Sequence, residues 1–181
     1  MLRPFDPLNL VWSVWALVWL VTAVWSARSV SREPFRNRLL VAALMVVGFF
    51  PLLARSRLPA VLAPRFVIGL ALTILGLGFA IWARVHLGRF WSGMVTLKEN
   101  HELIRSGPYA FVRHPIYTGL ITAAAGTALA RETFAALLAL GLIGVACWLK
   151  IRAEEKLLTN HFGDQYREYR RQVPALIPFV R

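Results

Sequence analysis

The sequence predicts an all-α, polytopic membrane protein, a helix bundle of about five transmembrane helices with a cytoplasmic C-terminal helix and loops. Its 181 residues are 57% hydrophobic, whereas soluble domains use about 45–50% apolar residues, so the excess must face lipid. These apolar residues fall into runs of membrane-spanning length. The net charge of +12 comes from short basic clusters between the runs, which is typical of membrane topology rather than of nucleic-acid binding.

One domain is expected over residues 1–181, because each span takes about 20 residues and leaves little for a second fold. Cys147 is the single cysteine and lies inside an apolar run, so it forms no internal disulfide. The first apolar run has a thin basic flank, Arg3 with Asp6 beside it, and no small-residue cleavage site before Arg28. We therefore expect a retained first helix rather than a removed signal peptide.

The first three spans are expected in the N-terminal half. Residues 8–27 carry four Trp and no charge, and they are long enough to cross the hydrocarbon layer. Residues 39–54 are shorter and carry Pro51 near their end, so this span relies on snorkelling arginines at its borders. Residues 66–83 form a third span whose small residues let a neighbouring helix approach closely; they are Gly69, Gly76, Gly78 and Ala80.

The C-terminal half begins with a polar stretch, residues 88–114, which is expected to be a surface loop with a short hairpin over 96–104. Residues 116–130 and 134–149 then predict a helical hairpin of spans four and five. The fifth helix is expected to continue past Lys150 into water, because an apolar stripe persists among charged residues.

Orientation follows from the distribution of Lys and Arg. In a five-span arrangement, 16 of these residues lie on the side of the C-terminus and the central loop, and 5 lie on the other side. The bias predicts a cytoplasmic C-terminus and central loop, with the N-terminus outside.

The first polar cluster lies at the mouth of the fourth span, where Arg113, His114, Pro115, Tyr117 and Gly119 follow one another closely. Proline suits the first helical position, arginine can hold a carboxylate in a bidentate pair, and free N–H groups at a helix start favour negative charge. Each residue alone is equally explained as a snorkelling arginine, an interfacial histidine or a tyrosine of an aromatic belt. Together they indicate a binding site.

The second cluster is Glu154 and Glu155 at the cytoplasmic end of the fifth helix. Adjacent side chains point about 100° apart on a helix, so at most one of the two is expected to face the bundle, while the other faces water or a neighbouring Arg. A carboxylate there can bind ribose hydroxyls or an ammonium group, and the alternative is a solvated helix end. The four histidines lack the short paired spacing of a metal site, so no metal is expected.

The two clusters together resemble the isoprenylcysteine carboxyl methyltransferase-like family, which includes phospholipid methyltransferases. The resemblance covers a core of about residues 66–181, and the first two helices match only in being hydrophobic. The matching segments are LGRFWSG (87–93), HELIRSGPYAFVRHPIYTG (101–119) and RAEEKLLTNHFGDQYREYRRQVPALIP (152–178).

The resemblance implies methyl transfer from S-adenosyl-L-methionine to a lipid-like or prenylated acceptor, such as the carboxylate of a prenylated cysteine, or a related lipid, amine or thiol, that enters from the membrane. It implies a cofactor site formed by Arg113, His114, Tyr117, Gly119, Glu154 and Glu155, with Arg113, His114 and Glu155 as catalytic residues. Arg113 would hold the cofactor's carboxylate, and a Glu its ammonium or ribose. An amine or hydroxyl acceptor would need a base, for which His114 or a Glu is the candidate.

The main alternative is an NADPH-dependent steroid or sterol reductase, a group that shares a His-Pro-x-Tyr string and an Ile-Pro-Phe ending. In that group Asn and Glu stand where this chain has Ile116 and Leu120, which favours the methyltransferase. A non-enzymatic scaffold or transporter would leave the polar clusters without a role, and five spans without repeats also argue against a transporter.

Overall fold

Six α-helices make up most of this computed structural model, which describes residues 6–23, 29–32, 35–53, 63–91, 96–98 and 102–178. The helices are α1 (Pro7–Ala23), α2 (Phe35–Leu53), α3 (Pro64–Leu87), α4 (Pro115–Arg131), α5 (Phe134–Phe162) and α6 (Asp164–Gln172). Short 3₁₀ turns and two short strands complete the described elements: η1 (Gly88–Phe90), η2 (Gly107–Ala110), β1 (Ser29–Arg32) and β2 (Thr96–Lys98).

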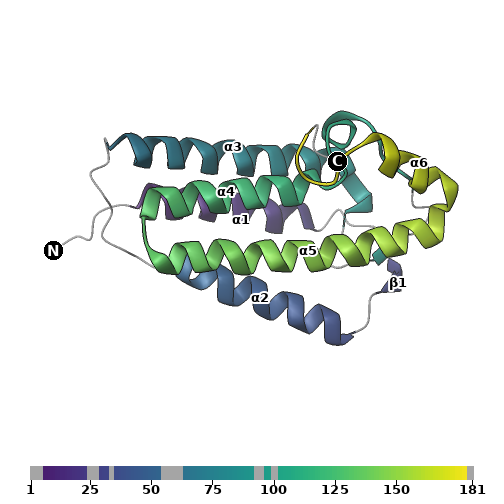
Figure 1. The fold of residues 1–181 in the computed structure, drawn as a ribbon, viewed down its shortest axis with the longest axis horizontal. Helices are drawn as coiled ribbons and strands as arrows, with labels where there is room; N and C mark the ends of the chain where they lie inside the picture. The colour runs from purple at the N-terminus through teal and green to yellow at the C-terminus, as the bar shows by residue number, and fades with distance from the viewer. Residues whose placement is uncertain are drawn as a thin grey trace.

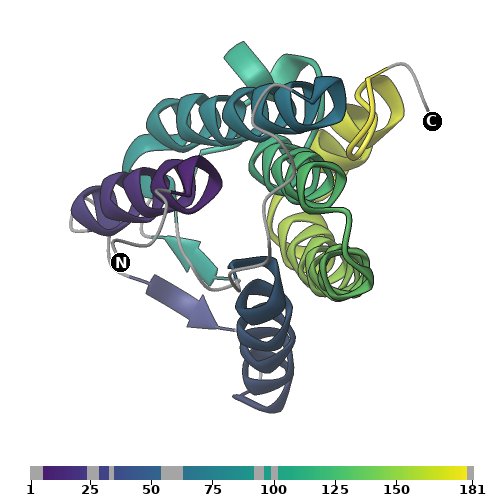
Figure 2. The same cartoon turned by 90° about the vertical axis from the view of Figure 1, so that its left-hand side faces the viewer.

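Five long helices run side by side, and successive helices alternate in direction (Figure 1). Viewed along the bundle, α3, α4 and α5 follow one another, with α1 beside α3 and α2 beside α5 (Figure 2). α6 and the C-terminal segment lie at the end where α4 begins and α5 ends, which we call the C-terminal end (Figure 1). The other end, where α1 begins and α4 meets α5, is the distal end.

The closest helix contact joins α3 to α4 through small residues. A Cβ atom added at Gly76 would lie 2.6 Å from the backbone nitrogen of Ala123, and one added at Gly119 would lie 2.4 Å from the carbonyl oxygen of Gly76. Gly69 and Gly126 approach each other in the same way. Small residues let helix backbones come this close in a membrane, where packing replaces the hydrophobic effect. The prediction from the third span is confirmed for Gly69 and Gly76.

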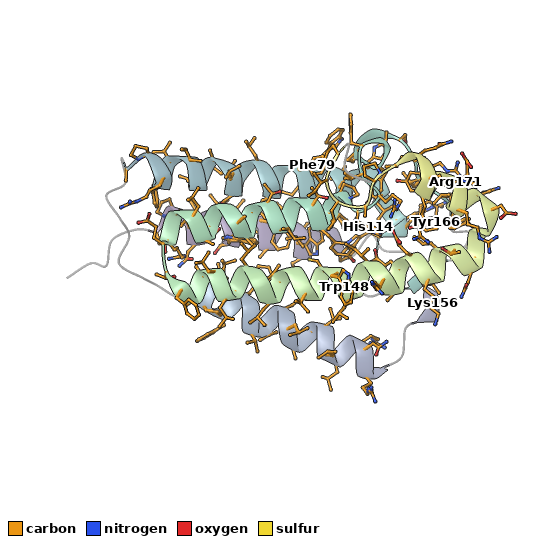
Figure 3. The ribbon with its side chains drawn as sticks, in the orientation of Figure 1. Phe79, His114, Trp148, Lys156, Tyr166 and Arg171 are labelled. Carbon is orange, nitrogen blue, oxygen red and sulfur yellow. The ribbon has the colours of Figure 1, made fainter. Side chains whose placement is uncertain are left out.

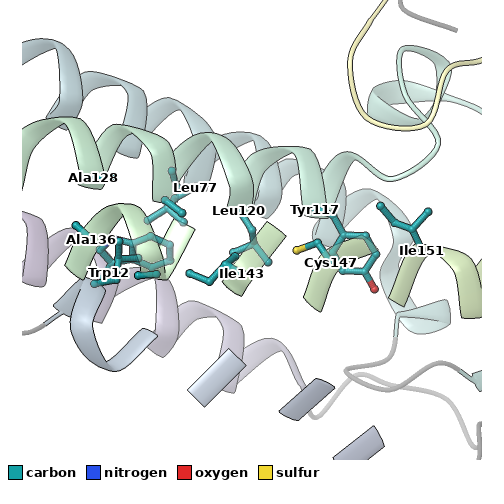
Figure 4. Packing of buried hydrophobic residues seen from close by; sticks show 13 residues of the cluster. Trp12, Leu77, Tyr117, Leu120, Ala128, Ala136, Ile143, Cys147 and Ile151 are labelled. Atoms are coloured by element: carbon teal, nitrogen blue, oxygen red, sulfur yellow. The ribbon is translucent and has the colours of Figure 1, made fainter. Parts of the chain in front are cut away.

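A row of buried side chains fills the space between this pair and the other helices. Figure 4 shows the row running from Trp12 to Ile151 along the bundle. The indole N–H of Trp12 donates to the hydroxyl of Thr127 at 3.0 Å, and that hydroxyl lies 3.1 Å from the hydroxyl of Thr73. A polar chain therefore links α1, α4 and α3 inside the apolar core, where such groups need partners.

A buried ion pair closes the distal end. Arg131 donates to Asp6 at 3.0 Å and to Asn9 at 2.7 Å, and the side chains of Arg131 and Asp6 are 0% and 6% exposed. Asp6 also accepts from the backbone N–H of Leu8 at 3.1 Å, which caps the start of α1. The pair therefore fixes the beginning of α1 against the end of α4.

The outer surface is apolar over most of the bundle. Large apolar side chains are exposed on the outer faces, among them Leu20, Val46, Phe50, Leu75, Phe134 and Leu137. Among the described residues three helical segments are long and apolar enough to cross a membrane, namely Arg36–Leu53, Pro64–Phe90 and Phe134–Phe162. α1 is apolar but shorter, and α4 is short and buried on two sides between α3 and α5. This is the architecture of an integral membrane helix bundle, as the sequence predicts.

Two local predictions are wrong. The hairpin predicted over 96–104 is not seen in its described residues, because Thr96–Lys98 pairs antiparallel with Ser29–Arg32 and residues 102–104 are not a strand, while residues 99–101 lie outside the described residues. Gly78 has no atom within 4 Å of its added Cβ position, so it does not belong to the helix contact. The predicted fifth helix beyond Lys150 is confirmed, since α5 continues to Phe162.

The two glycines of α3 provide a matched test of this packing. We expect Gly76→Ala to lower the thermal unfolding midpoint in detergent, because its methyl group would press on the backbone of α4, and overpacking typically costs about 1–3 kcal/mol. Gly78→Ala places the same group in open space and should leave the midpoint unchanged or slightly raised. Equal midpoints for the two variants would contradict this packing.

Candidate functional site

Both polar clusters of the sequence meet at the C-terminal end of the bundle. Arg113, His114 and Tyr117 come from the start of α4, and Glu154 and Glu155 come from α5. Figure 3 shows His114 where α4, α5 and α6 converge. We call these five residues the charged cluster.

The C-terminal segment holds the loop before α4 in place. The backbone N–H groups of Arg113 and His114 donate to the carbonyl oxygens of Pro174 and Ala175 at 2.8 and 3.1 Å. Both N–H groups precede the helix, so they have no partner inside it. Pro115 then begins α4, where its missing N–H costs nothing.

The turn that leads into this loop requires a glycine. Gly107 has φ +59°, and a Cβ atom added there would lie 2.7 Å from the His86 ring. The side chain of His86 lies 2.9 Å from the hydroxyl of Ser106. The end of α3 thereby positions the turn η2 and the loop that follows it.

Arg113 is held by protein groups in this structure. Its Nε and Nη2 atoms donate to the same oxygen of Glu155 at 2.9 and 2.6 Å. Its Nη1 atom donates to the carbonyl oxygens of Arg170 and Val173. The side chains of Arg113 and Glu155 are 10% and 13% exposed, so water screens the pair only weakly.

His114 lies between the two carboxylates. Its Nδ1 atom is 3.4 Å from Glu154 and its Nε2 atom is 3.3 Å from Glu155. Burial alone would lower the pKa of His114, but hydrogen bonds and charge from Glu154 and Glu155 more than offset burial, so the pKa is raised. The two carboxylates therefore favour the protonated imidazole, which can bridge both of them.

Glu154 and Glu155 differ in their surroundings. Glu154 accepts a hydrogen bond from the Tyr117 hydroxyl and lines a cavity that begins at the charged cluster. Glu155 also receives Arg170 at 3.3 Å and does not line that cavity. This agrees with the expectation that at most one Glu faces the bundle, because Glu154 faces the cavity and Glu155 faces the neighbouring guanidinium of Arg113.

Gly119 lies apart from the charged cluster. It is buried on the face of α4 that contacts α3 and does not line the cavity, although the neighbouring Leu120 does. Its role in this structure is to let α3 approach α4.

A cavity of about 290 Å³ joins the charged cluster to the membrane-embedded part of the bundle. Its polar end is lined by Arg113, His114, Tyr117, Lys150 and Glu154, and by the rings of Tyr109, Tyr166 and Tyr169. Its other end is apolar and lies among α1 and α2, where the lining residues are Trp15, Trp19, Met45 and Phe49. One cavity can therefore accommodate both polar and apolar parts of its ligands.

Several of these lining residues were not predicted as site residues. Trp15 and Trp19 follow Trp12 at helical spacing, and this spacing is the sequence signal that places them on one face of α1. Trp15 stacks on Trp19 with ring centroids 4.7 Å apart, and Trp19 meets Trp91 edge to face. Tyr109, Lys150 and Tyr166 carry no sequence pattern that distinguishes them from residues of an aromatic belt or a helix end.

The fold and this cavity define a polytopic helical membrane protein with a pocket that has a charged end and an apolar end. The sequence model of the phospholipid methyltransferase family matches residues 64–165. The chain belongs to this family, as its motifs predict.

The chain is also similar to proteins with known names. The chain is 38% identical over 104 residues to a protein-S-isoprenylcysteine O-methyltransferase of Schizosaccharomyces pombe, which covers 54% of this chain and 43% of the yeast protein. It is 32% identical over 118 residues to protein-S-isoprenylcysteine O-methyltransferase B of Arabidopsis thaliana, covering 62% and 58% of the two chains. The chain thus spans about half the length of the curated relatives it matches.

A solved structure shares the fold. The eukaryotic intramembrane Ras methyltransferase ICMT superposes with a TM-score of 0.58 at 24% identity, over 97% of this chain and 68% of that one. The match extends over nearly the whole chain, so α1 and α2 belong to the shared architecture although their sequences match only in hydrophobicity.

The position of His114 predicts a pH dependence of stability. Because the folded protein holds this proton more tightly than the unfolded chain, the stabilisation is fully present below about pH 6.5, the ordinary pKa of histidine, and is lost as the pH rises above it through the raised pKa. We expect the unfolding midpoint in detergent to fall over that range. His114→Gln should flatten this fall, whereas His161→Gln, at an exposed position, should preserve it. Identical profiles for parent and His114→Gln would contradict the assignment.

Proposed function

We propose that the protein transfers a methyl group from S-adenosyl-L-methionine to a lipid-like acceptor in the membrane, with the carboxylate of a prenylated cysteine as the favoured acceptor. The observation that carries this proposal is the single cavity that joins the charged cluster to an apolar section between α1 and α2. The names of the yeast and plant relatives support the reaction and the acceptor class.

The residues of the polar end fit the cofactor. Its sulfonium supplies an activated methyl group when it is bound. Glu154 offers a carboxylate in the cavity wall for its ammonium or ribose hydroxyls. The mostly apolar remainder of the wall keeps water away from the reacting groups.

Arg113 and Glu155 act in this proposal as positioning residues. The guanidinium of Arg113 is engaged by Glu155 and two backbone carbonyls, so its contacts favour holding the site together over holding the cofactor's carboxylate. Glu155 in turn orients His114 beside Glu154. Arg113 also lines the cavity, so its cofactor-binding role stays a prediction, and Glu154 is the carboxylate that we expect to contact the cofactor.

The state of His114 favours an acceptor that needs no base. The two carboxylates beside His114 favour its protonated form, which donates hydrogen bonds and is a poor base for an amine or a hydroxyl. A carboxylate acceptor is already ionised at neutral pH, so the residues need only align it. This reasoning favours a carboxylate over a lipid amine.

The apolar end of the cavity suits a lipid chain that arrives from the bilayer. α1 and α2 touch near the distal end, where Asn9 donates to the carbonyl oxygen of Leu53 at 3.2 Å and Trp12 meets Phe49 edge to face. The cavity reaches Trp15, Trp19 and Met45, which follow this contact in the direction of the charged cluster. Access between α1 and α2 would let a chain reach the cavity without crossing water.

The binding preference distinguishes the proposed enzyme from the NADPH-dependent reductase, which the comparisons do not favour. We expect the purified protein in detergent to bind S-adenosylmethionine and its demethylated product, as measured by calorimetry, and to give no heat with NADPH. Methyl transfer to a prenylated cysteine should exceed transfer to a lipid amine, because only the carboxylate needs no base. Binding of NADPH alone would overturn the proposal.

Substitutions of the two glutamates should have different effects, one on cofactor binding and the other on the stability of the fold. Glu154→Gln removes a charge from the cavity wall and should weaken cofactor binding about 10- to 150-fold, since a hydrogen bond to a charged group contributes about 1.5–3 kcal/mol. Glu155→Gln should chiefly lower the unfolding midpoint, because it leaves Arg113 without its carboxylate partner. The reverse assignment of effects would show that Glu155 is the ligand.

We further propose that the C-terminal end of the bundle faces the cytoplasm. The bias of 16 to 5 in Lys and Arg supports this orientation, and successive helices alternate in direction (Figure 1), as a five-span arrangement requires. Reporter fusions should find the C-terminus in the cytoplasm and the N-terminus outside. Both termini on one side would contradict a five-span arrangement.

A further inference from the structure

The hydroxyl group of Tyr166 is a buried hydrogen-bonding group that the charged cluster does not use. Tyr166 is 1% exposed and lines the cavity from α6, and its hydroxyl has no hydrogen-bond partner among the residues that the structure describes. Figure 3 shows Tyr166 beneath α6, beside the region of His114. Two other tyrosines of the cavity wall are paired: Tyr117 donates to Glu154, and Tyr169 donates to the carbonyl oxygen of Tyr109 at 2.6 Å.

A buried hydroxyl without a partner is unfavourable in the folded protein, so its presence in a pocket wall calls for an explanation. α6 is firmly positioned through Tyr169 and through the ion pair of Arg170 with Glu155. The Tyr166 side chain is therefore held where it is, and the group that can satisfy its hydroxyl is a ligand in the cavity.

The surrounding charges indicate what kind of ligand atom this is. Burial raises the pKa of Tyr166, and the negative charges of Glu155 and Glu154 raise it further, while Arg113 opposes them. The hydroxyl therefore keeps its proton and acts as a donor. The same carboxylates disfavour a second anion nearby, so a neutral acceptor fits better than a carboxylate.

We propose that the Tyr166 hydroxyl donates a hydrogen bond to a neutral acceptor, a ribose oxygen or a ring nitrogen, in the nucleoside part of the methyl donor. This inference rests on the proposed function and adds to it a ligand contact from α6. It divides the recognition of the donor between α5, where Glu154 meets the cationic or hydroxyl groups, and α6, where Tyr166 meets the nucleoside.

Tyr166→Phe tests the proposal because it removes only the hydroxyl. Two ligands are compared by calorimetry: S-adenosylhomocysteine, and 5′-methylthioadenosine, which keeps the nucleoside and lacks the amino-acid part. We expect Tyr166→Phe to weaken both about 3- to 10-fold, as for the loss of one neutral hydrogen bond. In the ligand-free state its unfolding midpoint should equal or exceed that of the parent, because an unpaired buried hydroxyl has been removed.

Thr159→Val is the matched control. Thr159 also carries a buried hydroxyl without a partner among the described residues, but it does not line the cavity. This variant should keep the parental affinity for both ligands and a midpoint at least as high as that of the parent.

The outcomes separate the two proposals. If the parent binds S-adenosylhomocysteine and Tyr166→Phe binds both ligands equally well, the role of Tyr166 is overturned and the proposed function stands. If Tyr166→Phe loses affinity for S-adenosylhomocysteine alone, the contact is to the amino-acid part and the nucleoside assignment is wrong. A lower ligand-free midpoint with unchanged affinity would show that the hydroxyl is structural. If the parent binds neither ligand, the proposed function itself fails.

Discussion

The ion pair between Arg113 and Glu155 is the interaction on which the site depends, because it joins segments that lie far apart in the chain. Arg113 precedes α4, Glu155 lies near the end of α5, and the carbonyl oxygens of Arg170 and Val173 complete the guanidinium's contacts. Both side chains are nearly buried, so removing one partner would leave an uncompensated charge at a cost of about 3–5 kcal/mol. The additional hydrogen bonds offset much of the desolvation penalty. With Glu155 committed to this structural task, Glu154 is left to face the cavity.

The close contact of α3 with α4 sets the geometry around that pair. Gly76 and Gly119 let the two backbones meet, which brings the beginning of α4 beside the end of α3. α4 is thereby enclosed by α3 and α5, so it can be short and rich in small residues, while α3 and α5 present apolar side chains outward. At the distal end, the pair of Arg131 and Asp6 fastens α1 to the same central helix.

The proposed function depends on one cavity that has a polar end and an apolar end. A soluble methyltransferase commonly builds its cofactor site on a doubly wound sheet. In this chain helix ends, a loop and the C-terminal segment supply the polar groups, and membrane-embedded tryptophans supply the apolar end. In the proposed function, the charged cofactor and the lipid would approach each other from opposite sides of this cavity. α6 contributes to this arrangement twice, through Arg170 to the ion pair and through Tyr166 to the wall of the cavity.

The sequence by itself determined the helices, because their signals are local. Charge-free runs, Pro115 at a helix start, the apolar stripe beyond Lys150 and the small residues of α3 all act within one helix or at its ends. The motifs around Arg113 and Glu154 also identified the family, and the same two segments meet in space.

The tertiary structure alone decided which residues and strands contact one another across the chain. Arg113 meets Glu155 across 42 residues and the C-terminal carbonyls across about 60, and β2 pairs with β1 rather than with the residues that follow it. Both glutamates are engaged because two elements converge on the end of α5, and Gly119 serves packing because α3 lies against it. No periodicity encodes such contacts. They depend on how the helices are arranged in three dimensions, which also decides that the Tyr166 hydroxyl is left for a ligand.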